Sequence, residues 1–217
     1  MTRLSLAVLV LLLAAAPLPA LPPTNVQTLE DATEVLDELA KIPLKSIPPK
    51  LLAEANGIAI IPRVVKVGFV LAGRGGRGLV MAREKDGTWG DPVFVNFGAA
   101  SIGFQAGVES TDVVLVFRQR KSLDRLLDGK GKITLGADVA VAAGPVGRVA
   151  AAATDAKLEA EILSYSRSRG LFAGVSFDGA VIRPDSAGNE RYRSDAQAVK
   201  AAAVLKNKLI EMAKETP

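Results

Sequence analysis

Residues 57–83 read GIAIIPRVVKVGFVLAGRGGRGLVMAR, and this stretch decides the fold class. Two runs rich in β-branched residues, Ile58 to Ile61 and Val64 to Leu71, precede a glycine-rich segment, and a third run follows at Leu79 to Arg83. Short apolar runs separated by glycine turns are typical of antiparallel strands. A glycine inside such a run, such as Gly68, favours a bulge or bend over a flat strand. We therefore expect a strongly curved or barrel-like antiparallel sheet.

The same pattern continues to about Ile182, and helices are expected on both sides of it. Further strands are predicted at Val93 to Phe97, Val113 to Phe117, Val139 to Ala143, Leu158 to Arg167 (with one exposed face) and Leu171 to Phe177. Helices are predicted at Val26 to Ala40 (opened by a Thr24–Gln27 capping box), Leu51 to Ala55, Leu123 to Leu127, and from a Ser194 cap to Thr216. The fold class is therefore α+β, with flanking N- and C-terminal helices.

The chain of 217 residues is long enough for one sizeable core, so a single globular unit is expected. Residues 21–50 form its N-terminal helix and a basic, proline-containing link, and residues 51–217 form the main domain with the C-terminal helix.

Residues 1–20 have the pattern of a secretory signal peptide. Arg3 supplies a positive charge, Leu4 to Ala16 an apolar stretch, and Leu18-Pro19-Ala20 a cleavage end. The apolar stretch is shorter than the ~18 residues of a spanning helix, which disfavours the alternative of an uncleaved anchor. Because the chain has no cysteine, it is not expected to be a lipoprotein. The expected location is periplasmic or secreted, peripheral to a membrane.

The absence of histidine and cysteine limits the chemistry of this chain. Nucleophilic triads, histidine acid–base catalysis and ordinary zinc sites each need an imidazole or a thiolate. Glu159 and Glu161 share one side of a predicted strand, but no companion group makes them a catalytic pair. We expect a protein that is not an enzyme and has no cofactor or metal. A net charge of +4 and a pI near 9.4 favour anionic partners without indicating nucleic-acid binding.

Residues Gly73 to Gly78 match the pattern G-x-G-x-x-G of dinucleotide sites. Such a site needs a helix directly after the glycines, whereas Leu79 to Ala82 is a predicted strand. A glycine-rich hairpin loop is the better interpretation. At its tip Arg74 and Arg77 would suit an anionic head group, although a merely solvated turn is the alternative.

Other basic residues lie in the proline-containing link and the first hairpin: Lys45, Lys50, Arg63 and Lys66. On a shared face each would add roughly 1 kcal/mol of attraction to an anionic membrane. Trp89 lies in a turn between strands, where it could be a lid on the core or an interfacial anchor, and the core lid is favoured.

The run from Leu51 to Gly179 resembles the SYLF domain, a family of lipid-binding modules of membrane-traffic and actin-associated proteins. The resemblance is carried by six stretches in order: Ala55 to Pro62, Val67 to Gly78, Gly87 to Pro92, Ser101 to Gly107, Ala142 to Arg148 and Tyr165 to Gly174. It implies binding of anionic phospholipids, phosphoinositides in eukaryotic members, through an N-terminal amphipathic segment with basic residues beside it. In this chain the first helix has an acidic polar face, so the basic character lies in the link from Lys41 to Lys50.

The leading hypothesis is a lipid-binding protein of the bacterial envelope that docks on anionic phospholipid head groups. Two alternatives stay open: a carrier that holds a lipid inside the curved sheet, and a structural or partner-binding envelope protein. Nucleic acid is not expected as a partner, and protein partners are unknown. The head-group residues predicted from the sequence are Lys45, Lys50, Arg63, Lys66, Arg74 and Arg77.

Overall fold

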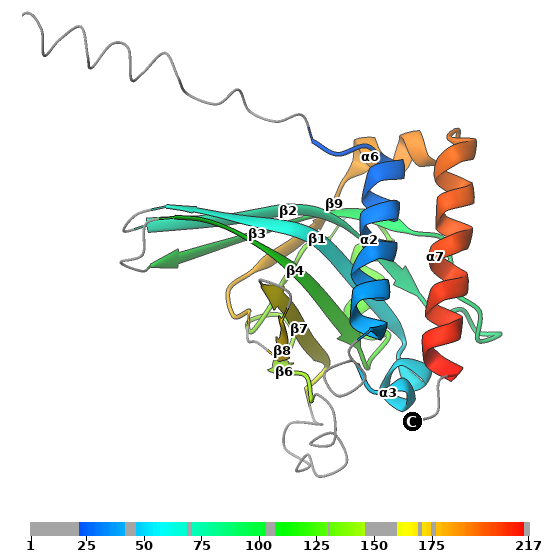
Figure 1. Cartoon of the computed structure of the whole chain (residues 1–217), viewed down its shortest axis with the longest axis horizontal. Helices are drawn as coiled ribbons and strands as arrows, with labels where there is room; N and C mark the ends of the chain where they lie inside the picture. The colour runs from blue at the N-terminus through cyan, green and yellow to red at the C-terminus, as the bar shows by residue number, and fades with distance from the viewer. Residues whose placement is uncertain are drawn as a thin grey trace, which may run out of the picture.

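A curved antiparallel sheet with a layer of helices on one face dominates the computed structural model of the chain (Figure 1). The structure describes residues 22–41, 47–68, 71–102, 107–129, 131–145, 160–168, 171–174 and 177–214. The α+β class with flanking N- and C-terminal helices, expected from the sequence, is confirmed.

Over the described residues, the sheet has nine strands in the order β5-β9-β3-β2-β1-β4-β7-β6, with β8 paired to β7. Its pairs are antiparallel except that β6 and β7 run parallel. The strands are β1 (Gly57–Gly68), β2 (Leu71–Ala82), β3 (Val93–Ile102), β4 (Gly107–Phe117), β5 (Ile133–Thr134), β6 (Val141–Ala143), β7 (Ile162–Ser168), β8 (Leu171–Gly174) and β9 (Val181–Pro184).

The helices are α2 (Asn25–Ala40), α3 (Pro49–Glu54), α4 (Lys121–Leu127), α6 (Ser186–Tyr192) and α7 (Ala196–Lys214). The capping box of Thr24 and Gln27 is present at the start of α2, as the sequence predicted. No helix within the described ranges has both the length and the hydropathy needed to cross a bilayer.

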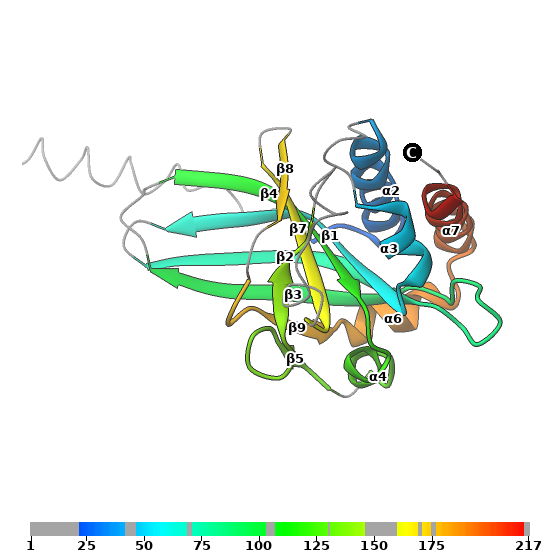
Figure 2. The same ribbon diagram turned by 90° about the horizontal axis from the view of Figure 1, so that it is seen from below.

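Each face of the sheet carries its own packed core. On the helix face, α2 and α7 bury their apolar sides against residues such as Ile60, Met81 and Val114. On the far face, the second core includes Phe97 and Phe177, whose rings meet edge to face at 5.9 Å. Figure 2 shows α4 and β5 on the side of the sheet away from α2 and α7. The alternating strand pattern therefore divides side chains between two hydrophobic cores.

The ends of β1 to β4 project beyond the helix layer as a four-stranded arm (Figures 1 and 2). The neighbouring strands stop short of it, because β9 pairs with β3 only at Val95 to Gly98 and β7 pairs with β4 only from Asp112 onward. A β-bulge in β1 marks the root of the arm, where the registers of both β1 ladders shift. We call residues 64–68, 71–76, 98–102 and 107–111 the arm.

The prediction of a hairpin loop at Gly73 to Gly78 is wrong, because these residues lie within β2. Two of the glycines are needed for packing: a Cβ at Gly78 would lie 2.3 Å from the carbonyl oxygen of Ile60, and one at Gly76 3.1 Å from Val64. The chain reverses instead between Gly68 and Leu71, since Gly68 pairs with Ala72.

Three smaller expectations also change. The C-terminal helix is capped by the Asp195 carboxylate, which accepts from the Gln197 and Ala198 amides, and not by Ser194. β7 has no exposed face over Ile162 to Ser166, where all five residues are buried, because Leu163 and Tyr165 pack into the helix-face core and Ile162 into the far-face core. The short elements β9 and α6 were not anticipated.

Trp89 is a core lid, as predicted, with 3% of its surface exposed.

Candidate functional site: the arm and its root

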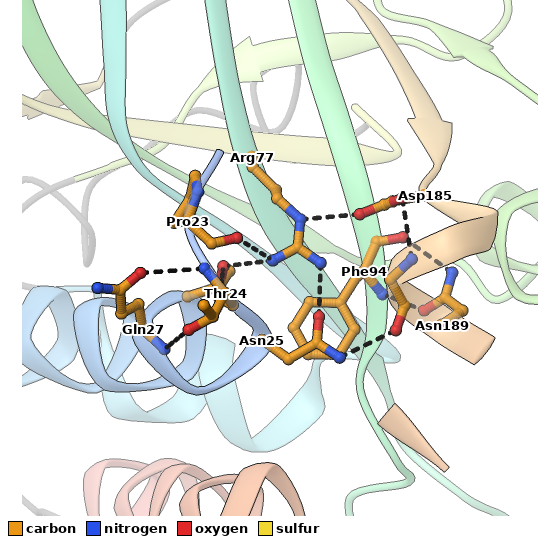
Figure 3. Close-up of polar contacts among 10 residues, drawn as sticks. Pro23, Thr24, Asn25, Gln27, Arg77, Phe94, Asp185 and Asn189 are labelled. Carbon is orange, nitrogen blue, oxygen red and sulfur yellow. Dashed lines mark hydrogen bonds and ion pairs between the residues drawn. The ribbon is translucent and has the colours of Figure 1, made fainter. Parts of the chain in front are cut away.

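Arg77 holds the N-terminal end of α2 against the sheet (Figure 3). Its side chain is 6% exposed, and its Nε donates to Asp185 at 2.8 Å. The remaining hydrogen bonds go to α2 and the residues before it: the Pro23 carbonyl, the Thr28 hydroxyl and the Asn25 side-chain oxygen, at 2.6–3.0 Å. Its guanidinium carbon also lies 4.8 Å from the centre of the Phe94 ring. Arg77 is therefore a buried structural residue.

The partners of Arg77 extend this polar network to α6. Burial raises the pKa of Asp185, but the hydrogen bonds from Arg77 and the Gly188 amide, together with the charges of Arg77 and Arg191, outweigh it, so that the pKa lies below its ordinary value. Asn25 donates to the Gly188 carbonyl at 2.9 Å, and Asn189 both accepts from and donates to the Phe94 backbone. The network joins α2, β2, β3 and α6 at the base of the arm.

A second polar cluster fixes the bulge in β1. Arg63 has a φ of 48°, in the left-handed region, and its amide donates to Asp112 at 2.9 Å. The buried Asp112 also accepts from Arg167 at 2.8 Å. The Arg63 side chain is paired with Asp31 of α2. Because this conformation is strained for a residue with a side chain, the carboxylate of Asp112 stabilises the bend from which the arm projects.

Lys66 and Arg74 form a basic pair on the arm. They are directly opposite in the β1–β2 ladder, with Ala99 and Glu109 completing the row on β3 and β4. Val64 belongs to the far-face core, and a Cβ at Gly76 would point at it. Since side chains alternate along a strand, Lys66 and Arg74 lie on the same far face, beyond the packed core.

Both members of the basic pair are half-buried, and neither forms an ion pair within the part of the chain that the structure describes. The Nε of Arg74 is buried and has no hydrogen-bond partner among the residues that the structure describes. A buried donor without an acceptor costs free energy. An anionic group docked on this row would supply a charge partner for the exposed parts of Arg74 and Lys66.

The six residues predicted to bind head groups therefore do not share one face. Lys50 is exposed on α3, at the opposite end of the sheet from the arm, and Arg63 faces α2 through Asp31 (Figure 1). The predicted loop-tip position of Arg77 is wrong, because Arg77 is buried under α2. Only Lys66 and Arg74 come together. Lys45 lies outside the described residues, as does Glu159 of the predicted carboxylate pair.

Asp112 and Asp185, which organise the root of the arm, were missed by the sequence analysis. Asp185 did carry a signal, because aspartate is a preferred N-cap residue of helices. In the structure its carboxylate caps α6 by accepting a hydrogen bond from the Gly188 amide at 3.0 Å. Nothing in the local sequence identifies the partner of Asp112, since Arg167 is 55 residues away.

A family model and several curated proteins similar to this chain all point to the same family. A family model described as "Ysc84: Las17-binding protein actin regulator" matches residues 98–216. Protein YSC84 of Saccharomyces cerevisiae is 42% identical over 151 residues, which are 69% of this chain and 32% of the relative. SH3 domain-containing YSC84-like protein 1 of Homo sapiens is 36% identical over 166 residues, which are 74% of this chain and 48% of the relative.

The aligned part of this chain thus spans about a third to a half of the length of these curated relatives. No solved structure matches the chain.

Proposed function

We infer the function of this chain from one premise: it belongs to the Ysc84 family of SYLF-domain proteins. On that basis we propose a non-enzymatic protein that docks on anionic phospholipid surfaces through the far face of its arm. The basic pair Lys66 and Arg74 contacts the lipid phosphates. The observation that carries this proposal is the basic pair itself: Lys66 and Arg74 lie side by side, have no ion-pair partner among the described residues, and occupy a part of the sheet that no described helix covers.

The helix layer is a poorer membrane surface than the arm. The apolar side of α2 is already used, since Leu29, Leu36 and Leu39 are 0% exposed in the helix-face core. Its outer side carries Glu30 and Glu34, which an anionic surface repels. For α2 to insert into a bilayer, its buried leucines would have to leave the core at about 1.5–3 kcal/mol each. The proposal therefore differs from insertion of an N-terminal amphipathic helix.

The other hypotheses receive less support. A lipid carrier needs space inside the curve, and the far face of the sheet is filled there by side chains such as Phe97, Phe177 and Ile182. Export through residues 1–20 and an envelope location remain part of the proposal, and they rest on the sequence of those residues alone.

Cosedimentation with vesicles tests the proposal. The chain from Leu21 onward is mixed with vesicles of phosphatidylcholine alone, or with one-third phosphatidylglycerol, at low and at ~0.15 M salt. We expect binding to the anionic vesicles only, weaker at the higher salt. Lys66→Gln with Arg74→Gln should reduce the partition coefficient about thirtyfold, at roughly 1 kcal/mol for each of the two basic residues near the surface.

The matched control is Lys85→Gln with Lys200→Gln, which removes the same charge from two exposed lysines outside the arm. This control should bind almost as the unmodified chain does. Equal losses in the two double variants would mean that binding follows net charge and not the arm. No binding to either vesicle would reject lipid docking.

A further inference from the structure

The outer face of α2 is strongly acidic in a protein whose net charge is +4. Five carboxylates lie on this helix and no lysine or arginine: Glu30, Asp31, Glu34, Asp37 and Glu38. Three of them are paired, Asp31 with Arg63, Asp37 with Lys208, and Glu38 with Lys41. Glu30 and Glu34 are exposed, and neither takes part in an ion pair within the described ranges. Their negative charge is therefore available to a partner.

A groove runs between α2 and α7, which lie side by side in the helix layer (Figure 1). It has a volume of about 470 Å³, with α2 from Glu30 to Lys41 as one wall and Ala201 and Val204 of α7 as the other. Val204 is 57% exposed. Among the described residues, three of the four exposed large apolar side chains lie on α7: Val199, Val204 and Ile210. Of these three, Val204 lines the groove beside Ala201, whereas Val199 and Ile210 do not.

We propose that the α2–α7 groove binds a cationic amphipathic helix of a partner protein. Charge complementarity selects this occupant, because lysine or arginine side chains can pair with Glu30 and Glu34 while an apolar side chain packs on Val204. From residue 30 to residue 41 the α2 wall is ~16 Å long at 1.5 Å per residue, which matches about three turns of a docked helix. This site is on the helix layer, so it is independent of lipid docking by the arm.

A designed peptide serves as the probe. It is a fluorescently labelled amphipathic helix of leucine and lysine, and its counterpart has glutamate in place of every lysine. Fluorescence anisotropy at ~0.15 M salt should show binding of the lysine peptide and none of the glutamate peptide. Glu30→Gln with Glu34→Gln should weaken binding about tenfold, and Val204→Ser about threefold. All three positions are on the surface, and a thermal melt checks that the variants remain folded.

The control is Asp124→Asn with Asp128→Asn, which removes one carboxylate from α4 and one from its C-cap, on the far face. Its affinity should stay within about twofold of the unmodified protein, as expected for distant sites. The inference is overturned if this control loses as much affinity as the Glu30 and Glu34 variant, if Val204→Ser has no effect, or if the lysine peptide does not bind.

Discussion

Arg77 is the residue whose surroundings most clearly distinguish structure from ligand binding in this protein. Its charge is matched by Asp185, and its other donors are used by Pro23, Asn25 and Thr28. Removing one partner of such a buried guanidinium destabilises a protein, because the charge is then left buried without compensation. Arg74, three residues earlier, has an unsatisfied donor instead. The two arginines of one sequence motif therefore have different roles.

Asp185→Asn should lower the free energy of unfolding by roughly 2 kcal/mol at neutral pH, the range for a hydrogen bond to a charged group. Asparagine keeps the helix cap, so the loss reports the charge that faces Arg77. Since the pKa of Asp185 is lowered in the folded state, its stabilisation is present above the ordinary value of 3.8 and is lost as the pH falls through the lower folded value.

Urea denaturation at a series of pH values measures this difference. The gap between the unmodified protein and Asp185→Asn should be largest near neutrality and should shrink below a pH of about 3.8. A gap that stays constant down to the acid limit would contradict the role given to the Asp185 carboxylate.

Strand β2 is the element that explains the glycine-rich motif. Gly76 and Gly78 face the bulged part of β1, where a Cβ would approach Ile61, Val64 or the Ile60 carbonyl at 3.1 Å or less. At Gly73, by contrast, an added Cβ has no heavy atom within 4 Å. The motif thus combines glycines required by close packing with a glycine in open space on the arm.

Gly78→Ala should destabilise the protein by about 1–3 kcal/mol, as an overpacked core does. Gly73→Ala is the matched control, and its stability should stay within about 0.5 kcal/mol of the unmodified protein. Chemical denaturation of the two variants side by side measures both values. Similar losses at the two positions would indicate that glycine is needed throughout β2 for a different reason.

The elements that the sequence predicted well are those determined by local patterns. The capping box of α2, the apolar periodicity of α7 and the burial of Trp89 all depend on residues close in the chain. The contacts that build the root of the arm could not be predicted in this way, because Arg77 and Asp185 are 108 residues apart. The sequence analysis did not predict β2 as one continuous strand. Its glycines Gly76 and Gly78 are required by close contact with β1, and this contact cannot be seen in the sequence of β2 alone.

Charge is distributed unevenly over the whole molecule. The arm carries the basic pair Lys66 and Arg74 on its far face, whereas the helix layer carries the acidic edge of α2. Neither feature is visible in the net charge, which only sums them. The sequence analysis predicted basic residues as the candidate site, and this set includes Lys66 and Arg74. It also grouped them with Lys50, Arg63 and Arg77, which the fold places elsewhere. In our account the arm faces a lipid surface and the helix layer stays in water, free to bind a cationic helix.

The most direct test of the central claim locates the surface that meets the membrane. Because the chain has no cysteine, single-cysteine variants can be labelled cleanly with an environment-sensitive fluorophore. Glu109→Cys places the label on the far face of the arm, in the row of Lys66 and Arg74, and Glu34→Cys places it on the helix layer. On addition of phosphatidylglycerol-containing vesicles, the account predicts a blue-shifted, brighter signal from the arm label and no change from the helix label. A shift at Glu34→Cys without one at Glu109→Cys would contradict it.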